Sequence, residues 1–294
     1  RATGELGMTA LKALIDADII TYRVGYAADK KVYMPTVNGI VYDTLTSAAE
    51  VKEFKAQHLG EDIEIERQLV VQPLDHCLTM VRTSLLAIQD VVGSNHELYL
   101  TGRGNFRLQL ATIAKYKGNR SEFERPTHYA DIREYMQRVW GARVIDDQEA
   151  DDEIGIRAYE INEGSEEKAV VVSIDKDLDT VAGFHYNFVT GAKYKISDEQ
   201  AIRCFYLQLL TGDRTDNITG IKGIGPKTAE KILGDIRREK QLWIAVRDAW
   251  DAHYPDGVPC EDGRTISVTE ALLETGRLLW IRRERNESLW EPPV

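Results

Sequence analysis

Short apolar runs that end in carboxylates are the feature of this sequence that most limits its fold. Two stretches show it clearly: AVVVSIDKDLDTVAG at residues 169–183 and LKALIDADII at residues 11–20. The carboxylates at their ends are Asp175, Asp177, Asp179, Asp16 and Asp18. A run that is apolar throughout, rather than alternating, is typical of a parallel strand covered by helices on both faces. The pattern therefore favours buried strands that deliver acidic side chains to their carboxyl ends.

Other segments repeat the alternation of strand and helix. We expect further strands in HELYLTG, ARVID and FHYNFV, and helices in PLDHCLTMVRTSLLAIQDVVG and EADDEIGIRAYEIN, where apolar residues recur at helical spacing. Strands separated by helical segments predict an α/β fold with a mainly parallel central sheet flanked by helices. The C-terminal third is largely helical in pattern, in DEQAIRCFYLQLL, PKTAEKILGDI, KQLWIAVRDAWDAHY and TEALLETGRLLWIRRER.

These segments suggest an α/β core over 8–197 and a mostly helical subdomain over 198–294. Residues 30–72 look like an elaboration of the core, because Asn38-Gly39 lies between β-rich flanks, as in a short hairpin, and a helical segment follows. We leave its role open. Cys77, Cys204 and Cys260 stand far apart without a Cys-x-x-Cys pair, so reduced thiols are expected rather than a disulfide framework or a zinc site.

No apolar run is long enough for a membrane span, and RATGELGMTALKAL at the start lacks a signal-peptide core. We therefore expect a cytoplasmic protein without a membrane partner. Because the residues before Met8 can be a lead or an expression remnant, they are excluded from the fold prediction.

Four acidic clusters are expected to meet at one edge of the sheet, where open parallel sheets bind ligands. The likeliest ligands are Asp16, Glu149, Asp151, Asp152, Asp175, Asp177, Asp213 and Asp216. Oxygen ligands without His or Cys select Mg²⁺ or Mn²⁺, which characteristically act on phosphate groups. Any single cluster is more often a solvated loop or a helix cap, as Asp198 is expected to be, but coincidence is a poor explanation for the whole set.

The acids also account for most of the net charge of −11, since removing these eight leaves −11 + 8 = −3. Basic patches can therefore coexist with the acidic site. One is IAKYKGNRSEFERP, in which Lys117 and Arg120 lie near Tyr116, a pattern that suits a phosphate backbone and a stacked base or, alternatively, an ordinary solvated helix end.

The second basic patch is GIKGIGPKTAEKIL, where glycines permit a tight turn and Pro226 suits the first turn of a helix. Backbone N–H groups at such a helix start can hold a phosphate. The segment lacks the spacing of a Walker A loop and looks like a helix-hairpin-helix motif, which grips DNA backbone without reading sequence. The expected DNA contacts here are Lys222, Gly223, Gly225, Lys227 and Thr228.

Together these motifs resemble one family, the 5′ nucleases, which include the flap endonucleases; the likeness is nearest to the 5′ to 3′ exonucleases of tailed bacteriophages. LIDADI, YKGNR, EADDEIG, SIDKDLDTV and GDRTDNITGIKGIGPKTAEKIL occur in the family's order from residue 11 to about 234. The resemblance implies a PIN-like nuclease core, a helical arch over about 104–140 and a helix-hairpin-helix over about 213–235.

The resemblance also implies roles for individual residues. Asp16, Glu149, Asp151 and Asp152 would surround one metal ion, and Asp175, Asp177, Asp213 and Asp216 a second. Lys117 and Arg120 match basic residues that contact the scissile phosphate and act in catalysis. Tyr116 is a candidate for stacking on a base. Gly223, Gly225 and Lys227 match the duplex-binding turn, where related enzymes also hold K⁺ through backbone carbonyls.

One departure from the family concerns the end of the second core strand. The family usually has an aspartate before NFR, whereas YLTGRGNFR places Gly102 and Arg103 there. The first metal site is therefore one carboxylate short, or is completed by water or by Asp18. Metal stoichiometry and rate are left open. Asp179 has no ligand assignment and is expected to fix its loop.

The function implied is Mg²⁺- or Mn²⁺-dependent hydrolysis of DNA at 5′ ends or flaps, leaving 5′-phosphate products, by a monomer in phage DNA replication, recombination or host DNA degradation. The sequence leaves open whether the enzyme prefers exonuclease or flap-endonuclease cleavage, and whether it also cleaves RNA in RNA–DNA hybrids. Two alternatives remain: a catalytically weakened DNA-junction-binding protein of the same fold, and a PIN-like ribonuclease, a class that generally lacks the helix-hairpin-helix.

Overall fold

The computed structural model describes residues 10–120, 124–164 and 166–293. The prediction about a signal peptide concerned residues 1–14, and most of that segment lies outside the described residues. Contacts divide the chain into two compact units, one of residues 1–18, 88–123 and 141–294 and another of residues 19–87 and 124–140. This division does not coincide with the expected one at residue 197. Each unit is described by itself below.

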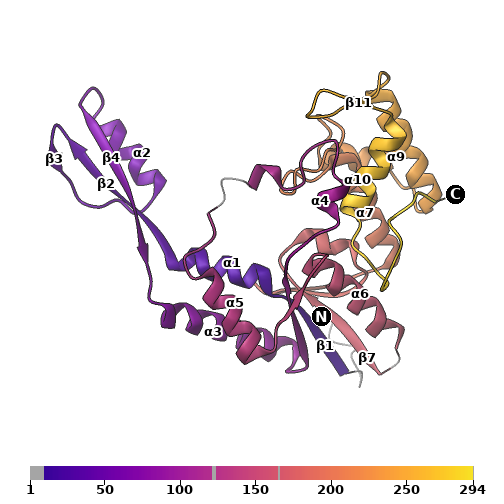
Figure 1. The fold of residues 1–294 in the computed structure, drawn as a ribbon, viewed down its shortest axis with the longest axis horizontal. Coiled ribbons are helices and arrows are strands. Elements are labelled where there is room, and N and C mark those ends of the chain that lie inside the picture. The colour runs from indigo at the N-terminus through magenta and orange to yellow at the C-terminus, as the bar shows by residue number, and fades with distance from the viewer. Residues whose placement is uncertain (1–9, 121–123, 165, 294) are drawn as a thin grey trace. The chain divides into compact units, whose positions relative to one another are not determined.

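The first unit is built on a six-stranded sheet in the order β6-β5-β1-β7-β8-β9. The central strands β1 and β7 lie side by side in it (Figure 1). Its strands are β1 (Ala10–Asp16), β5 (His96–Thr101), β6 (Arg143–Ile145), β7 (Glu167–Val172), β8 (Gly183–Asn187) and β9 (Ala192–Ile196). Neighbouring strands pair in parallel except β8 and β9. The expected mainly parallel α/β sheet is confirmed, and β9 is an antiparallel edge strand that the sequence patterns did not predict.

The apolar runs form the centre of this sheet because their side chains are buried on both faces. Leu14 and Val171 belong to a core cluster that also contains Ala150, Ile154 and Ala158 of helix α6 (Ala150–Glu163). Since β1 and β7 pair in register, with Ile15 opposite Val172, the residues just after the two strands lie side by side. Parallel pairing thus brings the acids that follow each run to one edge.

A helical layer packs around a second apolar cluster in the same unit. It includes α7 (Asp198–Thr211), α8 (Pro226–Leu233), α9 (Glu239–His253) and α10 (Val268–Leu279). Trp250 is fully buried in this cluster, and its indole N–H donates to the Leu209 carbonyl at 3.0 Å. A short hairpin of β10 (Val258–Pro259) and β11 (Thr265–Ile266) precedes α10.

The final helix is shorter than the sequence pattern predicts. It ends at Leu279, whereas helical periodicity continued to residue 285. The following residues instead run along α6: the Arg282 N–H donates to Asp152 at 3.2 Å, and Arg285 pairs with Glu153 at 2.8 Å. Tertiary ion pairs and hydrogen bonds outweigh helical propensity here.

The second unit holds the elaboration predicted for residues 30–72. Strands β2 (Asp29–Val37), β3 (Ile40–Val41) and β4 (Ile63–Val71) form an antiparallel sheet, and helix α2 (Ala48–Gln57) lies between β3 and β4 in the chain. Asn38 and Gly39 have φ values of 51° and 82°, as a tight primed turn requires, so the predicted hairpin is confirmed.

The described residues also form the helices α1 (Ala17–Ala28), α3 (Leu74–Val92), α4 (Arg107–Leu110) and α5 (Tyr129–Trp140), and a 3₁₀ turn, η2 (Lys176–Thr180), follows β7. The region expected to be a helical arch, about 104–140, contains α4, the single 3₁₀ turn η1 (Gly118–Arg120) and α5; residues 121–123 lie outside the described chain. No helix of the described residues is long and apolar enough to cross a membrane.

Candidate active site

The first acidic residues meet where β1 and β7 end. Asp16, only 4% exposed, accepts a hydrogen bond from the Ser173 hydroxyl at 3.0 Å. The same hydroxyl accepts the Asp175 N–H at 3.0 Å. Ser173 therefore ties the carboxylate that ends β1 to the loop that follows β7, a contact made possible by the parallel pairing of the two strands.

Asp151, in the first turn of α6, lies among these carboxylates. Burial, followed by the negative charges of Asp16, Asp175 and Glu149, raises its pKa well above the usual value. Residues from three distant parts of the chain therefore act on one carboxyl group. The convergence expected from the sequence is present for these four side chains.

The loop after β7 forms the second part of the cluster. Burial raises the pKa of Asp175, with contributions from Asp216 and Asp213, although the Asp177 N–H opposes it. Burial, with Asp175 and Asp213 next, raises the pKa of Asp177 to about 7. Because both groups repel their neighbours when ionised, this part of the site favours a proton or a cation over bare carboxylates.

The turn after α7 supplies Asp213 and Asp216. Asp213 and Ile218 form an isolated antiparallel bridge with hydrogen bonds of 3.0 and 2.7 Å, and the Asp213 carboxylate accepts the Thr215 N–H at 2.8 Å. This turn places both acids beside the loop after β7. It also contacts the basic segment at residues 115–120.

Lys117 and Arg120 are paired with the acidic cluster. The Lys117 ammonium contacts Glu149 and lies 3.4 Å from Asp216 Oδ2, while the Arg120 guanidinium contacts the other oxygen of Asp216. Burial alone would lower the pKa of Lys117, but the charges of Glu149 and Asp216 raise it, so the side chain stays charged. Both cations therefore lie beside the acidic cluster and pair with two of its carboxylates.

Tyr116 differs from its expected role. It was a candidate for stacking on a base, but its side chain is only 4% exposed. Its hydroxyl donates to Glu149 Oε2 at 3.0 Å and to Asp216 Oδ2 at 2.8 Å. The buried ring cannot offer a face to a base, and the hydroxyl instead links the two parts of the acidic cluster.

The environment of Asp152 also differs from that expected of a metal ligand, because its carboxylate forms an ion pair with Arg107. Arg107 Nη1 and Nη2 lie 2.6 and 2.9 Å from the two Asp152 oxygens, and both side chains are buried. Asp152 further accepts the N–H groups of Glu149 and Arg282 at 3.2 Å each. It closes a capping box at the start of α6, which holds Glu149 in place rather than adding a free ligand.

The departure at Gly102 has a steric basis. A Cβ atom there would come within 2.2 Å of Asp146 Oδ1 and 2.8 Å of the Ile145 carbonyl. Asp146 accepts the Arg103 N–H at 2.6 Å and so occupies the space into which a side chain at 102 would project. Asp18 accepts the Thr101 N–H at 2.8 Å. A family-like aspartate at position 102 does not fit this loop as it is folded.

Two polar residues support the acids in ways the sequence patterns missed. Gln208 of α7 donates to Asp177 Oδ1 at 2.7 Å, and Ser173 holds Asp16. The sequence contained a hint of the role of Gln208, because this polar residue interrupts the apolar run FYLQLL on a helix that faces the core. Asp179 accepts the Tyr194 hydroxyl at 2.8 Å, which agrees with a role in fixing its loop.

The glycine-rich turn lies in the same unit. Gly225 caps α8, Pro226 is its first residue, and Ala229 is fully buried in the helical core. Five residues of the turn expected to contact DNA are exposed: Lys222, Gly223, Gly225, Lys227 and Thr228. The space in front of Gly223 and Gly225 is open, so a ligand backbone can approach the turn closely.

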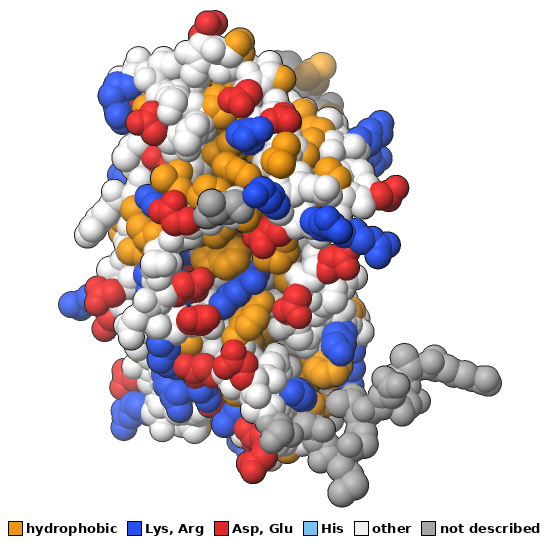
Figure 2. All heavy atoms as spheres, turned by 90° about the vertical axis from the view of Figure 1, so that its right-hand side faces the viewer, with side chains coloured by type: hydrophobic (Ala, Val, Ile, Leu, Met, Phe, Trp, Pro, Cys, Tyr) orange, Lys and Arg blue, Asp and Glu red, His pale blue; other side chains and the backbone are white. Residues whose placement is uncertain are grey.

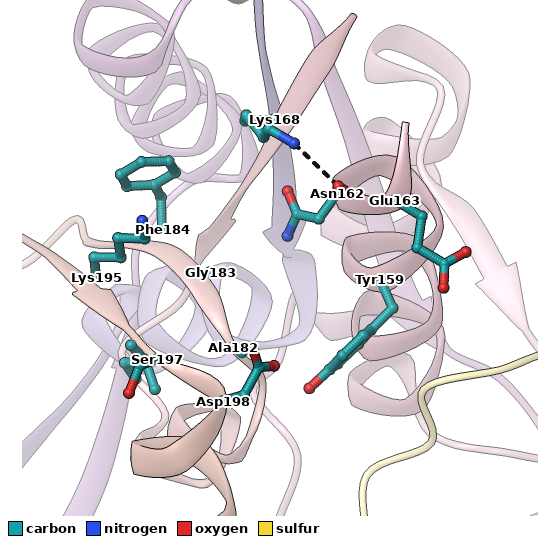
Figure 3. Close-up of a pocket in the computed structure, with 11 residues that line it drawn as sticks. Tyr159, Asn162, Glu163, Lys168, Ala182, Gly183, Phe184, Lys195, Ser197 and Asp198 are labelled. Carbon is teal, nitrogen blue, oxygen red and sulfur yellow. Dashed lines mark hydrogen bonds between the residues drawn. The ribbon is translucent and has the colours of Figure 1, made fainter. Parts of the chain in front are cut away.

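A cavity of about 570 Å³ lies away from these acids, near the start of β7 and β8 (Figure 3). Lys168 and Asn162 border it, and Lys168 donates to the Asn162 carbonyl at 3.0 Å. Since active sites of parallel sheets lie at the carboxyl ends of strands, we do not include this cavity in the site.

In the described parts of the chain, no three acidic, histidine or cysteine side chains are arranged so that they could hold a metal ion as they stand. Lys117, Arg120 and Tyr116 occupy oxygens of Glu149 and Asp216 that a metal would need. The donors nevertheless fit a hard divalent cation in type. The pKa values of Asp151 and Asp177 are raised first by burial and then by repulsion from neighbouring carboxylates, and such a cation would relieve that repulsion.

Surface charge elsewhere is mixed. Figure 2 shows one face on which Lys and Arg side chains lie among Asp and Glu and around exposed apolar side chains. No single sign dominates this face, although the chain as a whole carries −11. The acids that gather at the site account for much of that excess.

Comparisons with known proteins identify homologues, although no family model matches. The chain is 30% identical over 147 residues to the exodeoxyribonuclease of Enterobacteria phage T3, covering 49% of this chain and 48% of that protein. It is 27% identical over 179 residues to the 5′-3′ exonuclease of Buchnera aphidicola, covering 54% and 61%. The matches therefore span less than two thirds of either relative.

A solved structure covers more of the chain. The flap endonuclease of bacteriophage T5, in a pseudo-enzyme–product complex with DNA and metal ions, matches with a TM-score of 0.54 over 92% of this chain and 88% of that one, at 16% identity. At that identity the likeness concerns the fold. Over about half of its length the chain is similar in sequence to a phage exodeoxyribonuclease and a bacterial 5′-3′ exonuclease, and it has the fold of the phage T5 flap endonuclease.

Proposed function

We propose that this protein is a divalent-metal-dependent 5′ nuclease that hydrolyses DNA phosphodiester bonds at 5′ ends or 5′ flaps and leaves 5′-phosphate products. The observation that carries the proposal is the gathering of Asp16, Glu149, Asp151 and Asp175 at the carboxyl edge of a parallel sheet. Such a concentration of oxygen donors beside basic residues is suited to phosphate chemistry. The names of the relatives, an exodeoxyribonuclease and a 5′-3′ exonuclease, support the same reaction.

Two groups of residues would hold the metal. Asp16, Glu149 and Asp151 would provide one group and Asp177, Asp213 and Asp216 the other, with Asp175 adjoining both. Asp152, although proposed from the sequence, would act by orienting Glu149. Bound Mg²⁺ or Mn²⁺ would supply Lewis-acid stabilisation of charge and an activated water. The T5 neighbour, solved with DNA and metal ions, supports this type of site.

Lys117 and Arg120 would act on the substrate phosphate. Both cations are already held at the edge of the acidic cluster by Glu149 and Asp216. Glu149 and Asp216 would be drawn toward a bound metal, and Lys117 and Arg120 would then be available to a phosphate oxygen. A cation placed in this way stabilises the negative charge that develops on the phosphoryl group.

The glycine-rich turn would hold the duplex. Lys222 and Lys227 are exposed beside it, and the open space before Gly223 and Gly225 admits a sugar–phosphate backbone. Thr228 lies in the first turn of α8 and would add a hydroxyl contact. We also propose that this turn binds K⁺ through backbone carbonyls, in addition to the divalent metal at the acidic site.

The remaining parts of the proposal concern context. We propose that the protein works as a monomer in the cytoplasm of a bacterial host, in phage DNA replication, recombination or host DNA degradation. RNA–DNA hybrids are a further candidate substrate. The similarity to a phage exodeoxyribonuclease supports the proposal that the protein acts in phage DNA metabolism.

A second candidate function is a DNA-junction binder with weakened catalysis. The observation that favours it is that Gly102 replaces a carboxylate of the family while Lys117 and Arg120 block acidic oxygens. A binder would retard a 5′-flap duplex without cutting it. An RNA-cutting PIN-like enzyme is disfavoured by the glycine-rich turn.

A metal-dependence assay tests the proposal. Protein is incubated with a 5′-flap duplex and a blunt duplex, labelled at either end, in Mg²⁺, Mn²⁺ or EDTA. We expect cleavage with either metal, none in EDTA, and products that a 5′-phosphate-dependent exonuclease degrades. Retardation without cleavage in all three conditions would favour the junction binder, and cleavage in EDTA would exclude a metal-dependent site.

A further inference from the structure

Strand β4 has an open edge along its length. Its nine residues, Ile63–Val71, pair with β2 alone, and in the described parts of the chain no other backbone group bonds to them. Proteins usually blunt such an edge with Lys, Pro or a bulge, or keep it short. β4 contains neither Lys nor Pro, and its register with β2 continues without a bulge. Another strand can therefore add to this edge.

Acidic side chains line the first half of the β4 edge. Glu64 and Glu66 lie on the same face, because side chains alternate along a strand. Both glutamates are exposed. Among the described residues, the one side chain bonded to either is Gln68, whose amide donates to Glu66 at 3.1 Å. In that part of the chain, the two carboxylates therefore pair with no cation.

Strand β9 is a second open edge, at the end of the six-stranded sheet. It pairs with β8 alone among the described strands. Lys193 and Lys195 lie on one face of its five residues, and Tyr194 lies on the other. Both lysines are exposed, and neither pairs with a carboxylate in the residues that the structure describes, although Lys195 lies 5.3 Å from the centre of the Phe184 ring. The β9 edge thus carries two positive charges at the spacing at which the β4 edge carries two negative ones.

We propose that β9 of one copy of this chain pairs with the open edge of β4 in a second copy. The antiparallel register that fits places Lys193 opposite Glu66. It also places Lys195 opposite Glu64, because both pairs of charges are two residues apart. Opposite charges at facing positions stabilise neighbouring strands, whereas two β9 strands centred on Tyr194 would set lysine against lysine.

The same register fits the apolar face of both strands. Tyr194 comes opposite Ile65, and Ile196 comes opposite Ile63. Aromatic and β-branched side chains that face each other across two strands also stabilise the pairing. Tyr194 is 39% exposed and Ile65 is half-buried, so the pairing would remove apolar surface of both from water.

The contact joins two different surfaces, so it is heterologous. A copy whose β4 edge is occupied still offers its own β9 edge, and association closes into a dimer or ring or continues as a chain of copies. Every copy contains all the acids of the site, so the monomer proposed above remains the active unit and cleavage does not require the contact. The inference goes beyond the proposed nuclease function and does not depend on it.

The first experiment measures mass as a function of protein concentration. Sedimentation equilibrium of the full chain, in EDTA and without DNA, is compared for wild type and two charge reversals: Glu64→Lys with Glu66→Lys, and Lys193→Glu with Lys195→Glu. Wild type should rise above the monomer mass as concentration increases. Each reversal alone should stay monomeric, because like charges then face one another.

Mixing the two reversals supplies the decisive comparison. An equimolar mixture should associate again, since the reversed β4 edge matches the reversed β9 edge. The matched control is Asp248→Lys with Asp251→Lys on α9, an equal change of charge at two exposed residues. This control should associate as wild type does.

The second experiment tests the register. Ile65→Cys and Tyr194→Cys are introduced into separate copies, which are mixed and oxidised with diamide, and a covalent dimer is detected after denaturation without reductant. Facing positions have Cβ atoms about 4.5–5.5 Å apart, so this pair should form a disulfide. Leu69→Cys with Tyr194→Cys should not, because exposed Leu69 lies on the same face of β4 but about 14 Å further along it. Each variant oxidised alone reports the background from the native cysteines.

Thermal unfolding verifies that each variant is folded, and if a charge reversal is not, the cysteine pair decides. A wild type that stays monomeric at every concentration would overturn the proposal, and so would a mixture of the two reversals that does not associate. Loss of association in only one reversal would show that its edge pairs with a different surface, which also overturns it. Dilute wild type and both reversals should cut a 5′-flap duplex equally. Failure of that assay would remove the proposed function and leave the association to be decided by mass alone.

Discussion

Arg107 and Asp152 form a buried two-pronged ion pair, with N–O distances of 2.6 and 2.9 Å. Arg107 also donates to the carbonyls of Leu278 and Trp280 at 2.8 and 2.7 Å. One guanidinium therefore joins the start of α6, where Glu149 and Asp151 lie, to the end of α10. The acidic site and the C-terminal segment are parts of one packed structure.

Breaking this pair should destabilise the protein strongly. Arg107→Met leaves the Asp152 carboxylate buried without its counter-charge, a loss of about 3–5 kcal/mol in free energy of unfolding. Urea denaturation measures it. The matched control is Arg138→Met, because Arg138 forms an exposed pair with Glu134 that should contribute at most about 1 kcal/mol. Equal effects from the two variants would show that burial of the Arg107 pair is unimportant.

The same pair predicts a loss of stability in acid. Burial acts to raise the pKa of Asp152, but the charge and hydrogen bonds of Arg107 hold it below its usual value. A depressed folded-state pKa gives stability that is present above the unfolded-state pKa and is lost as pH falls through the folded-state value. Unfolding of Asp152→Asn should therefore depend less on pH below about 4 than that of wild type.

Tyr116→Phe should impair the acidic site without weakening DNA binding. The change keeps the buried ring and removes the hydroxyl that donates to Glu149 and Asp216. Hydrogen bonds to charged groups contribute about 1.5–3 kcal/mol, so we expect cleavage to fall by roughly ten- to a hundredfold. DNA affinity in EDTA should be unchanged. If Tyr116→Phe cleaved DNA at the wild-type rate, the hydrogen bonds of the hydroxyl to the two carboxylates would be unimportant for cleavage.

Asp177→Asn should nearly abolish cleavage while DNA binding persists. The residue lies among Asp175 and Asp213, and its charge would be needed to hold a divalent cation. Asp179→Asn is a close control, since it lies two residues further on but its carboxylate is engaged by Tyr194. Single-turnover rates in Mg²⁺ and affinities in EDTA are compared for both. Equal rates for the two variants would contradict the assignment of Asp177 to the metal.

Without divalent metal, the acidic cluster should make the protein less stable at higher pH. Burial and the neighbouring Asp175 and Asp213 raise the pKa of Asp177 to about 7, above the value of about 4 of an unfolded aspartate. A raised folded-state pKa gives stability that is complete below the unfolded-state pKa and is lost as pH rises through the folded-state value.

Melting temperature in EDTA, measured from pH 5 to about pH 8, tests this dependence. We expect a decline toward pH 8 that Asp177→Asn reduces, and a stabilisation by Mg²⁺ that grows with pH because the cation replaces the proton. A melting temperature that is independent of pH in wild type would show that the carboxylates do not repel one another.

Restoring the family's carboxylate at position 102 should harm this protein. Gly102→Asp places Cβ within 2.2 Å of Asp146 Oδ1 and 2.8 Å of the Ile145 carbonyl, so the loop after β6 must move. Overpacking of this kind costs about 1–3 kcal/mol. Chemical denaturation measures the cost, and Gly102→Asp combined with Asp146→Ala should recover part of it. A more stable single variant would contradict the steric explanation.

The sequence by itself determined the α/β architecture, the hairpin at Asn38 and the edge of the sheet where acids gather. Apolar runs that do not alternate can only be buried strands or helices, and parallel pairing then brings their carboxyl ends together. Asp16, Asp151 and Asp175 were predictable for this reason. Local patterns of charge and periodicity were sufficient to predict these features, because each strand, turn and acidic strand end is encoded within one short segment.

Only the tertiary structure decided which partner each charge meets. Arg107 pairs with Asp152, and Tyr116 is buried between Glu149 and Asp216 instead of facing a base. The course of the chain after Leu279 and the space in front of Gly102 were settled in the same way. These contacts join residues far apart in the chain, and the energy of a charge depends on burial and on its neighbours, which no local pattern of residues contains.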